Sequence, residues 1–339
     1  MRTRSLSKAL SITSGVWETG RVTDYDRSVT LCGNTVASVG RGNGQDVVQV
    51  RVQAEGEGAE EVTVVGKELR AAIRHMKGEV IVRPDGCVSD GTITEWVKTV
   101  PSYRILKDEA EGLPERFTIS ASHLEAISGM FTNDSWHLAM MGIYASPRCV
   151  IGTDSYRAHW IGDIQPFDKE DWLYIPPVIA RVVPKGKFTL RKNDNTAALV
   201  ADGISITWLS HRPHIPNFGM LSAESDCVDI GVSQDIINQL TLICNSLPKT
   251  EKVCGIRESD SLRLELYNRE TSFTIQAPHT KWATCAYNLG WLLDAFNFTS
   301  GGRWQVPCAP LKQCVITNGN RRAAVMPVDF ARWEKEQCL

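Results

Sequence analysis

The chain has 339 residues, of which 42% are hydrophobic and 22% are charged, and its formal net charge is −2. This composition is typical of a soluble globular protein of two or three domains. The near-zero net charge excludes a uniformly basic nucleic-acid-binding protein, so any basic surface must be local. No apolar run approaches the roughly 18 residues of a membrane span, and we expect a cytoplasmic protein without membrane contact.

The ten cysteines form no Cys-x-x-Cys pair and no Cys/His spacing typical of zinc sites. Secreted domains rich in disulfides are usually much shorter, so we expect reduced and mostly buried thiols. Arg2 and Arg4 precede Leu6 without a continuous apolar run or a small-residue cleavage site. This beginning indicates a helix of the mature protein rather than a targeting peptide.

The first third of the chain predicts two helices separated by β-like runs. One helix begins near Leu6, and a second covers Lys67–Lys77 after the run Glu61–Val65. The second helix has an apolar face, and its opposite face carries Lys67, Arg70, Arg74 and Lys77. This basic face is either solvated or in contact with phosphates. Further basic charge on the first helix comes from Arg2, Arg4 and Lys8.

The middle third repeats the pattern. A helix begins near Ser122, where Ser122 and Glu125 match a capping box. The apolar stripe of this helix consists of Leu124, Ile127 and Phe131. The run Trp172–Ile175 precedes another helix that begins near Pro176, and its basic residues are Arg181 and Lys185.

The last third predicts two helices of different character. The first begins near Ser233, with an apolar stripe formed by Ile236, Leu240, Ile243 and Leu247. The second, Asn288–Phe298, follows the β-like run Ala283–Tyr287. It carries Asp294 and no basic residue.

These elements return at intervals of about 110 residues, which indicates an internal repeat. Each repeat has the order helix, strands, helix, strands, and its closing β-like run is entered at Ile93, Ile204 and Val315. Polar stretches at Lys107–Pro114 and Ser222–Asp226 separate the repeats. We therefore predict an α+β fold of three similar domains, each with two helices packed on antiparallel sheets. They cover residues 1–112, 113–223 and 224–339, the last with a short C-terminal extension.

Motifs for enzymatic chemistry are absent from the sequence. There is no phosphate-binding glycine loop, no Gly-x-Ser-x-Gly and no His-Glu-x-x-His. His211 and His214 are the nearest approach to a metal pair, but a proline lies between them and no third ligand is evident, so we predict neither metal nor cofactor. Asp154, Tyr156 and His159 offer an acid/base set, which remains a minor alternative without a nucleophile to serve.

Four short motifs resemble those of one family. The polar turn Thr153–Ala158, which follows the apolar run Cys149–Ile151, resembles the Thr-Asp-Gly-His-Arg-Leu hallmark of the bacterial sliding clamps, the β subunits of DNA polymerase III. Ile215–Phe218 is similar to the Phe-Pro-Asp-Tyr segment of that family. Asn288 and Trp291 match its Asn-x-x-Tyr, and Val325–Val328 matches its Val-Met-Pro-Met ending.

The resemblance implies a DNA-clamp fold in which three domains per chain close head to tail as a homodimeric ring around double-stranded DNA. It implies a processivity factor rather than an enzyme, which tethers the replicative polymerase, the clamp loader and other replication and repair proteins. These partners carry a short peptide, typically Gln-Leu-x-Leu-Phe, that enters a hydrophobic pocket. The implied pocket residues are Thr153, Ser155, Tyr156, Arg157, Ala158, Pro216, Met220, Leu221, Asn288, Trp291, Cys314, Met326, Pro327 and Val328. The implied DNA-facing residues are Lys8, Lys67, Arg70, Arg74, Lys77, Arg181 and Lys185.

Two departures from the family pattern affect the pocket. Tyr156 and Ala158 stand where the family has His and Leu, so the partner peptide is expected to differ from the consensus. The chain also continues past the last motif, and we hypothesise that the tail 329–339, with Phe330 and Trp333, partly covers the groove. Two other readings stay open: a clamp-like scaffold without ring closure, and an α+β enzyme that uses Asp154, Tyr156 and His159.

Overall fold

A computed structural model shows the chain as two compact units. Unit 1 comprises Met1–Ser128 and Tyr174–Pro213, and unit 2 comprises Gly129–Leu173 and His214–Leu339. The structure describes residues 1–17, 27–42, 46–101, 110–131, 141–164, 172–209, 215–221, 226–247, 253–257, 262–266, 272–275, 285–308 and 312–328.

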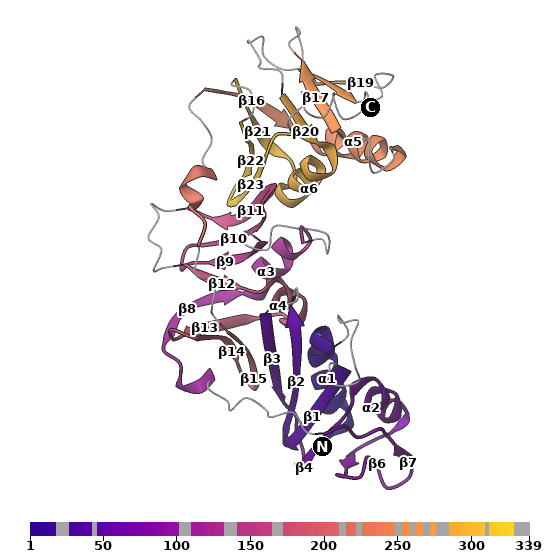
Figure 1. Ribbon diagram of the computed structural model, residues 1–339. Coiled ribbons are helices and arrows are strands. Elements are labelled where there is room, and N and C mark those ends of the chain that lie inside the picture. The colour runs from indigo at the N-terminus through magenta and orange to yellow at the C-terminus, as the bar shows by residue number, and fades with distance from the viewer. Residues whose placement is uncertain are drawn as a thin grey trace. The chain divides into compact units, whose positions relative to one another are not determined.

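Unit 1 is built on an antiparallel sheet of eight strands in the order β4-β1-β2-β3-β15-β14-β13-β8 (Figure 1). The strands are β1 (Ser28–Gly33), β2 (Thr35–Gly42), β3 (Asp46–Gln53), β4 (Ala59–Val65), β8 (Glu115–Ser120), β13 (Lys187–Lys192), β14 (Thr196–Ala201) and β15 (Ile204–Leu209). In the middle of the sheet, β3 pairs with β15, which places Val50 opposite Ile206. A separate sheet has the order β5-β6-β7, from Ile81–Val82, Cys87–Ser89 and Thr94–Trp96.

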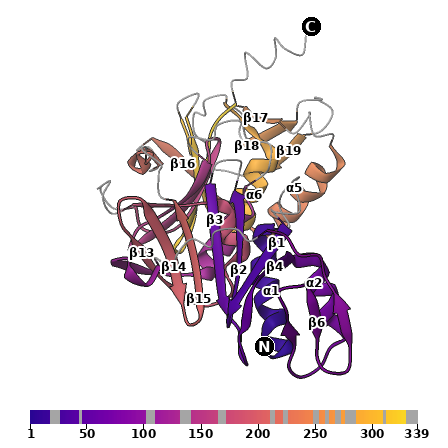
Figure 2. The ribbon, with the colours of Figure 1, turned by 60° about the horizontal axis from the view of Figure 1, so that its bottom comes forward.

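The helices of unit 1 are α1 (Thr3–Trp17), α2 (Gly66–Ala72), α3 (Ala121–Ser128) and α4 (Pro177–Val182), and a 3-10 turn, η2 (Ile73–His75), continues α2. Helix α1 packs on β2 and β3 and contacts both α2 and α4. It lies alongside α2 in Figures 1 and 2. A Cβ at Gly15 would lie 2.3 Å from Cγ1 of Val182, so glycine is needed where α1 meets α4.

Unit 2 contributes most of a second eight-stranded antiparallel sheet, β12-β9-β10-β11-β23-β22-β21-β16. Its strands are β9 (Met141–Ala145), β10 (Cys149–Asp154), β11 (Arg157–Gly162), β12 (Leu173–Ile175), β16 (Cys227–Val232), β21 (Gly302–Pro307), β22 (Cys314–Asn318) and β23 (Arg321–Val325). The chain passes between the units within β12. Unit 2 also holds α5 (Gln234–Ser246), α6 (Leu289–Thr299) and a sheet β19-β18-β17-β20, from Ser272–Ile275, Leu262–Leu266, Val253–Arg257 and Cys285–Asn288.

One strand order occurs three times. In β4-β1-β2-β3, β12-β9-β10-β11 and β20-β17-β18-β19, the fourth strand along the chain lies beside the first. Each set is enclosed in sequence by two helices, α1 and α2, α3 and α4, or α5 and α6. The predicted order of helix, strands, helix, strands is therefore present in all three repeats. Each of the two large sheets combines strands of two successive repeats. Because these strands pair across the repeat boundary, the chain forms two compact units.

Two helix caps agree with the sequence. The Ser233 hydroxyl accepts a hydrogen bond from the Ile236 amide at 3.4 Å at the start of α5. Oδ1 of Asn288 accepts one from the Trp291 amide at 3.2 Å at the start of α6. Side-chain oxygens of Ser and Asn satisfy amides that the first helical turn leaves unpaired.

Other details of the helices were predicted wrongly. Helix α3 begins at Ala121, so Ser122 lies inside its first turn and is not the cap of a capping box; its hydroxyl is hydrogen-bonded with that of Ser120 instead. The buried stripe of α5 consists of Ile237, Leu240 and Cys244 rather than the predicted Ile236, Leu240, Ile243 and Leu247. Val315 lies in β22, one strand before the closing strand of its repeat.

Several sequence predictions fall outside the described residues: His211 and His214, most of the two boundary stretches, and the tail 329–339. Among the helices that the structure describes, none is long and apolar enough to cross a membrane. Seven of the cysteines, namely Cys32, Cys87, Cys149, Cys227, Cys244, Cys308 and Cys314, are free thiols in the structure, and Cys32 is the exposed one among these seven.

Candidate functional site

The Thr153–Ala158 motif forms the tight turn between β10 and β11. Oδ1 of Asp154 accepts hydrogen bonds from the backbone amides of Tyr156 at 3.1 Å and of Arg157 at 3.0 Å. The Thr153 hydroxyl accepts one from the Ser155 amide at 3.2 Å. Ser155 has φ 78°, in the left-handed region where glycine is least strained. The turn geometry therefore explains why a glycine is suited to the position that Ser155 occupies.

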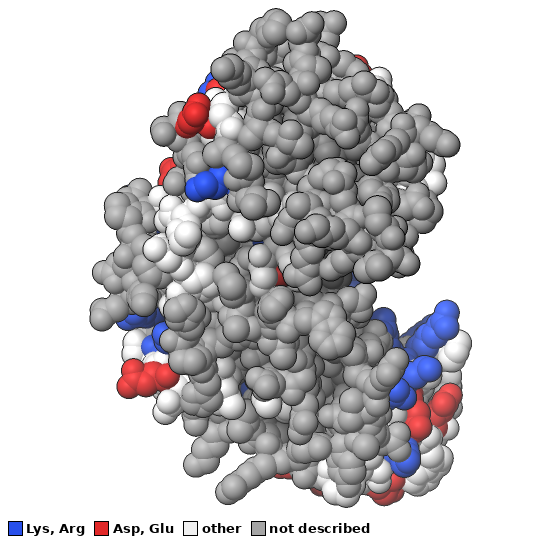
Figure 3. Space-filling model, turned by 45° about the horizontal axis from the view of Figure 1, so that its top comes forward, with Lys and Arg blue, Asp and Glu red and all other residues white. Residues whose placement is uncertain are grey.

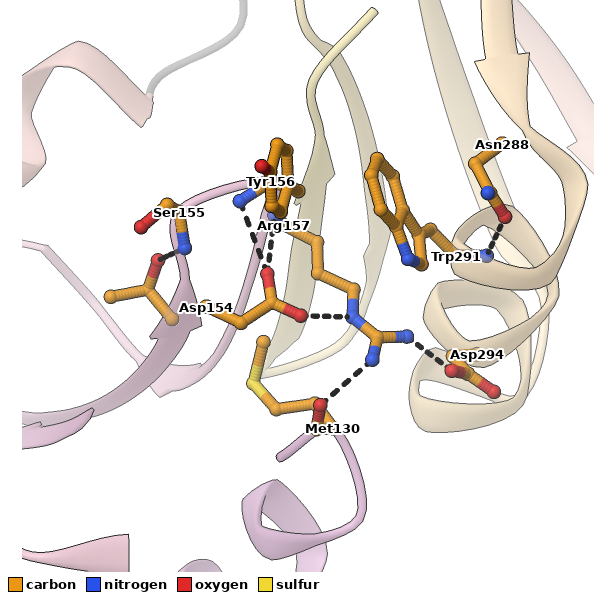
Figure 4. A network of polar contacts seen from close by, with 9 residues as sticks. Met130, Asp154, Ser155, Tyr156, Arg157, Asn288, Trp291 and Asp294 are labelled. Carbon is orange, nitrogen blue, oxygen red and sulfur yellow. Dashed lines mark hydrogen bonds and ion pairs between the residues drawn. The ribbon is translucent and has the colours of Figure 1, made fainter. Parts of the chain in front are cut away.

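The Arg157 side chain joins three segments of unit 2 (Figure 4). Its Nε donates to Oδ2 of Asp154 at 2.9 Å, and its Nη2 donates to the Met130 carbonyl at 2.7 Å. Its Nη1 pairs with Oδ2 of Asp294 on α6. The guanidinium thus connects the turn, the residues after α3 and the body of α6.

Arg157 is only 4% exposed, and its donors face three protein acceptors, so it positions the turn. Thr153, Ala158 and Cys314, which were also predicted for the pocket, are buried as well. Asp294, whose carboxylate completes the network, was noted in the sequence only as an acidic residue of α6.

Two aromatic rings form the exposed part of the site. The rings of Tyr156 and Trp291 stack with centroids 4.8 Å apart and an angle of 20° between their planes. Tyr156 is 40% exposed, and Trp291 is half-buried in the first turn of α6. Since the carboxamide oxygen of Asn288 caps that turn, Asn288 holds the tryptophan in place.

The end of β23 lies against this turn. The Met326 amide donates to the Tyr156 carbonyl at 2.8 Å, and the Val328 amide donates to the Ala286 carbonyl at 2.8 Å. Met326 is 40% exposed, and Pro327 and Val328 are half-buried. The structure therefore brings the first, third and fourth motifs together at one end of the large sheet.

The second motif reaches the same region through η5 (Phe218–Leu221). The side-chain Nε2 of Gln313 donates to the Met220 carbonyl, and Gln313 precedes Cys314, which lies opposite Val325 in the sheet. Met220 is 74% exposed. Phe218 anchors the segment: its ring lies 5.2 Å from that of Tyr144 and 4.9 Å from that of Trp172. Of the other predicted residues, Pro216 is buried and Leu221 is half-buried.

Exposed apolar side chains are concentrated here. Across the described residues, the exposed large hydrophobics are Ile81, Trp96, Tyr156, Leu209, Met220, Leu242 and Met326. Three of these, Tyr156, Met220 and Met326, are predicted pocket residues. Flexible methionines beside an aromatic pair make a surface suited to an apolar peptide.

The alternative acid/base set is not assembled. Asp154 is committed to Arg157 and two amides, and His159 is buried with its ring stacked on Phe298 at 4.6 Å. Burial, together with the positive charge of Arg157, lowers the pKa of His159 to about 3. An imidazole buried in the core is not placed to exchange protons with a substrate, so the structure does not bring Asp154, Tyr156 and His159 together as the predicted acid/base set. No group of three His, Cys, Asp or Glu in the described part of the chain is placed to hold a metal.

The predicted DNA-facing residues lie in unit 1, and all seven are exposed. They belong to α1, to α2 and η2 with the residues that follow, and to α4 with the residues that follow. Lys67, Arg70 and Arg74 line a hollow of about 750 Å³ together with Ser7 of α1. Figure 3 shows Lys and Arg side chains gathered at one edge of the surface with a few acidic ones beside them.

Comparison with solved structures defines the class of fold. The DNA polymerase III subunit beta from Pseudomonas aeruginosa matches 97% of this chain and 99% of its own, with a TM-score of 0.75 and 15% identity. The sliding clamp from Bartonella birtlesii bound to griselimycin matches 97% and 98%, with a TM-score of 0.74 and 15% identity. The sliding clamp from Caulobacter crescentus matches 97% and 98%, with a TM-score of 0.75 and 12% identity.

The chain therefore has the fold of the bacterial DNA polymerase III beta sliding clamps over 97% of its length, with a strongly divergent sequence. No protein-family model and no curated protein matches it by sequence.

Proposed function

We propose that the protein is a sliding clamp, a processivity factor that encircles duplex DNA and tethers a polymerase through the site around Tyr156, Trp291 and Met326. The fold, the thrice-repeated strand order, the exposed apolar site and the basic helices of unit 1 support this proposal. In a tethered complex the polymerase stays at a high effective concentration near the primer end without any reaction by the clamp itself.

The strand order carries the proposal. One large sheet joins β3 to β15, and the other joins β11 to β23; in both, the third strand of one set meets the last strand of the next repeat. The two equivalent strands left without such a partner in the described sheets are β19 and β7. The missing junction is therefore β19 of one chain with β7 of a second copy, which closes a head-to-tail homodimer of six domains.

The exposed edge of β7 suits this pairing. The Val97 amide donates to the Gly86 carbonyl at 2.9 Å, and the Asp90 amide donates to the Ile93 carbonyl at 3.2 Å. Because successive residues of an antiparallel strand direct their backbone groups alternately to one neighbour and the other, those of Thr94 and Trp96 point away from β6. Trp96 is 68% exposed. Unpaired edges attract further strands, and pairing with a second chain satisfies them. The domains of this ring are residues 1–112, 113–223 and 224–339.

Sedimentation of Thr94→Pro tests the dimer. Proline removes an outward amide and leaves the β6–β7 bonds intact, so the variant is expected to sediment as a monomer at concentrations where the unchanged protein is a dimer. The control is Thr94→Ala, which loses the same contact with the Ser89 hydroxyl but keeps the outward amide. A concentration-independent monomer for the unchanged protein would contradict ring closure.

A scaffold that recruits partners without closing a ring is the second candidate. The observation that favours it is the shortness of the free edges: β7 has three residues and β19 has four, whereas β3 and β15 pair through five residues. Retention on nicked circular DNA separates the two candidates. A ring is retained, and Arg70→Gln with Arg74→Gln weakens the retention by removing charge from the DNA-facing surface.

A further inference from the structure

The basic charge of the six helices is unevenly distributed between the two units. Helices α1, α2 and α4 of unit 1, with the turn η2 that continues α2, contain Arg4, Lys8, Lys67, Arg70, Arg74 and Arg181. The sequences of α5 and α6 in unit 2 contain neither Lys nor Arg. The exposed face of α5 presents Asn238, Gln239 and Leu242 instead.

Two hollows between α1 and α2 share Ser7, Ile73 and Arg74 in their linings, so they meet as one groove. The cations that line this basic groove are Arg2, Arg4, Arg27, Lys67, Arg70, Arg74 and Lys77. Glu79 is the one carboxylate among the described lining residues. Of the acids nearby, Glu55 pairs with Arg2 of the groove at 3.1 Å, and Glu68 accepts from the Lys98 amide at 2.7 Å. The groove thus carries a concentrated positive charge in a chain of net charge −2.

Among the described residues that line the groove, none is Tyr, Trp, Phe or His. Proteins that hold single strands stack bases on aromatic rings, whereas contacts to a duplex backbone need only cations and small polar groups. The groove chemistry therefore fits the phosphates of a duplex better than the bases of a single strand.

We propose that unit 1 alone holds the duplex, through the basic groove between α1 and α2, and that α5 and α6 of unit 2 contribute no phosphate contact. This inference rests on the proposed function, because it assigns the DNA contact of the clamp to one part of each chain.

Binding of the full-length protein to a short fluorescent duplex, followed by anisotropy over a series of salt concentrations, tests the proposal. The groove variant is Lys67→Gln with Arg74→Gln. It is expected to bind about tenfold more weakly, and its slope of log K against log salt is expected to fall by about 1.8, which is two phosphate contacts.

The matched control removes the same charge from unit 2: Arg148→Gln with Arg303→Gln, both exposed. It is expected to change affinity less than twofold. Equal losses in the two variants would overturn the proposal, because net charge alone would then explain binding. An unchanged groove variant would overturn it as well.

Two more measurements complete the test. A single strand of equal length is expected to bind more weakly than the duplex, and tighter binding of the strand would contradict a backbone groove. Binding to a linear duplex does not require the protein to form a closed ring. If the groove variant loses linear binding while the unchanged protein is not retained on circles, this inference stands and the proposed clamp function fails.

Discussion

The side chains of Asp154 and Arg157 form an ion pair of 2.9 Å in the interior of unit 2, and both are almost fully buried. The same carboxylate also accepts two amides of its own turn. The pair fixes the backbone that presents Tyr156, so a buried electrostatic contact determines the shape of an exposed apolar site.

Arg157→Met is expected to lower the free energy of unfolding by about 3–5 kcal/mol, because it leaves Asp154 buried without its cation. Urea denaturation measures the loss. Arg322→Met is the control, since its ion pair with Asp163 at 2.8 Å is largely exposed and contributes less than about 1 kcal/mol. Similar losses in the two variants would show that burial of the network has no special importance.

Ser155→Gly is expected to raise the free energy of unfolding by about 0.5–1 kcal/mol, because glycine adopts a positive φ without the strain of a Cβ. Ser300→Gly, at φ 56° after α6, should also raise the free energy of unfolding. Ser246→Gly, in the last turn of α5, should instead destabilise the protein. A loss of stability in Ser155→Gly would mean that its hydroxyl, not its backbone, matters.

Trp291→Ala should weaken binding of a Gln-Leu-x-Leu-Phe peptide at least tenfold, because it removes half of the aromatic stack. Isothermal titration calorimetry gives the dissociation constant. Leu242→Ala serves as the control, since that leucine is 72% exposed on α5 and belongs to neither the proposed peptide site nor the proposed dimer junction, and it should leave peptide binding unchanged. If both variants bind the peptide as the unchanged protein does, the peptide site lies elsewhere.

His159 should make the fold sensitive to acid. Burial lowers its pKa from 6.5 to about 3, so between these values the unfolded chain binds a proton that the folded chain does not. Stability therefore falls as pH falls below 6.5, by about 1.4 kcal/mol between pH 7.5 and 5.5. His159→Phe keeps a ring against Phe298 and should lose this part of the pH dependence. An equal pH dependence in both proteins, measured by urea denaturation, would show that the buried histidine is protonated without penalty.

Of three helix caps that depend only on neighbours along the chain, the sequence predicted two correctly, and the Ser122 cap was wrong. Ser233 and Asn288 cap their helices because a cap needs only the next three residues, and the repeat was visible because each helix has its own apolar face. The burial of Arg157 was not predictable, because its acceptor Asp294 lies 137 residues away and is brought near only by the packing of α6. The stack of Tyr156 on Trp291 arises in the same way.

The most direct test of the clamp proposal is topological. Protein assembled on nicked circular DNA is separated from free protein by gel filtration, before and after a single cut linearises the circle. We expect the protein to elute with the circular DNA and to leave it after the cut, because a closed ring slides off an open end. Equal retention on circular and linear DNA, or retention on neither, would contradict the account.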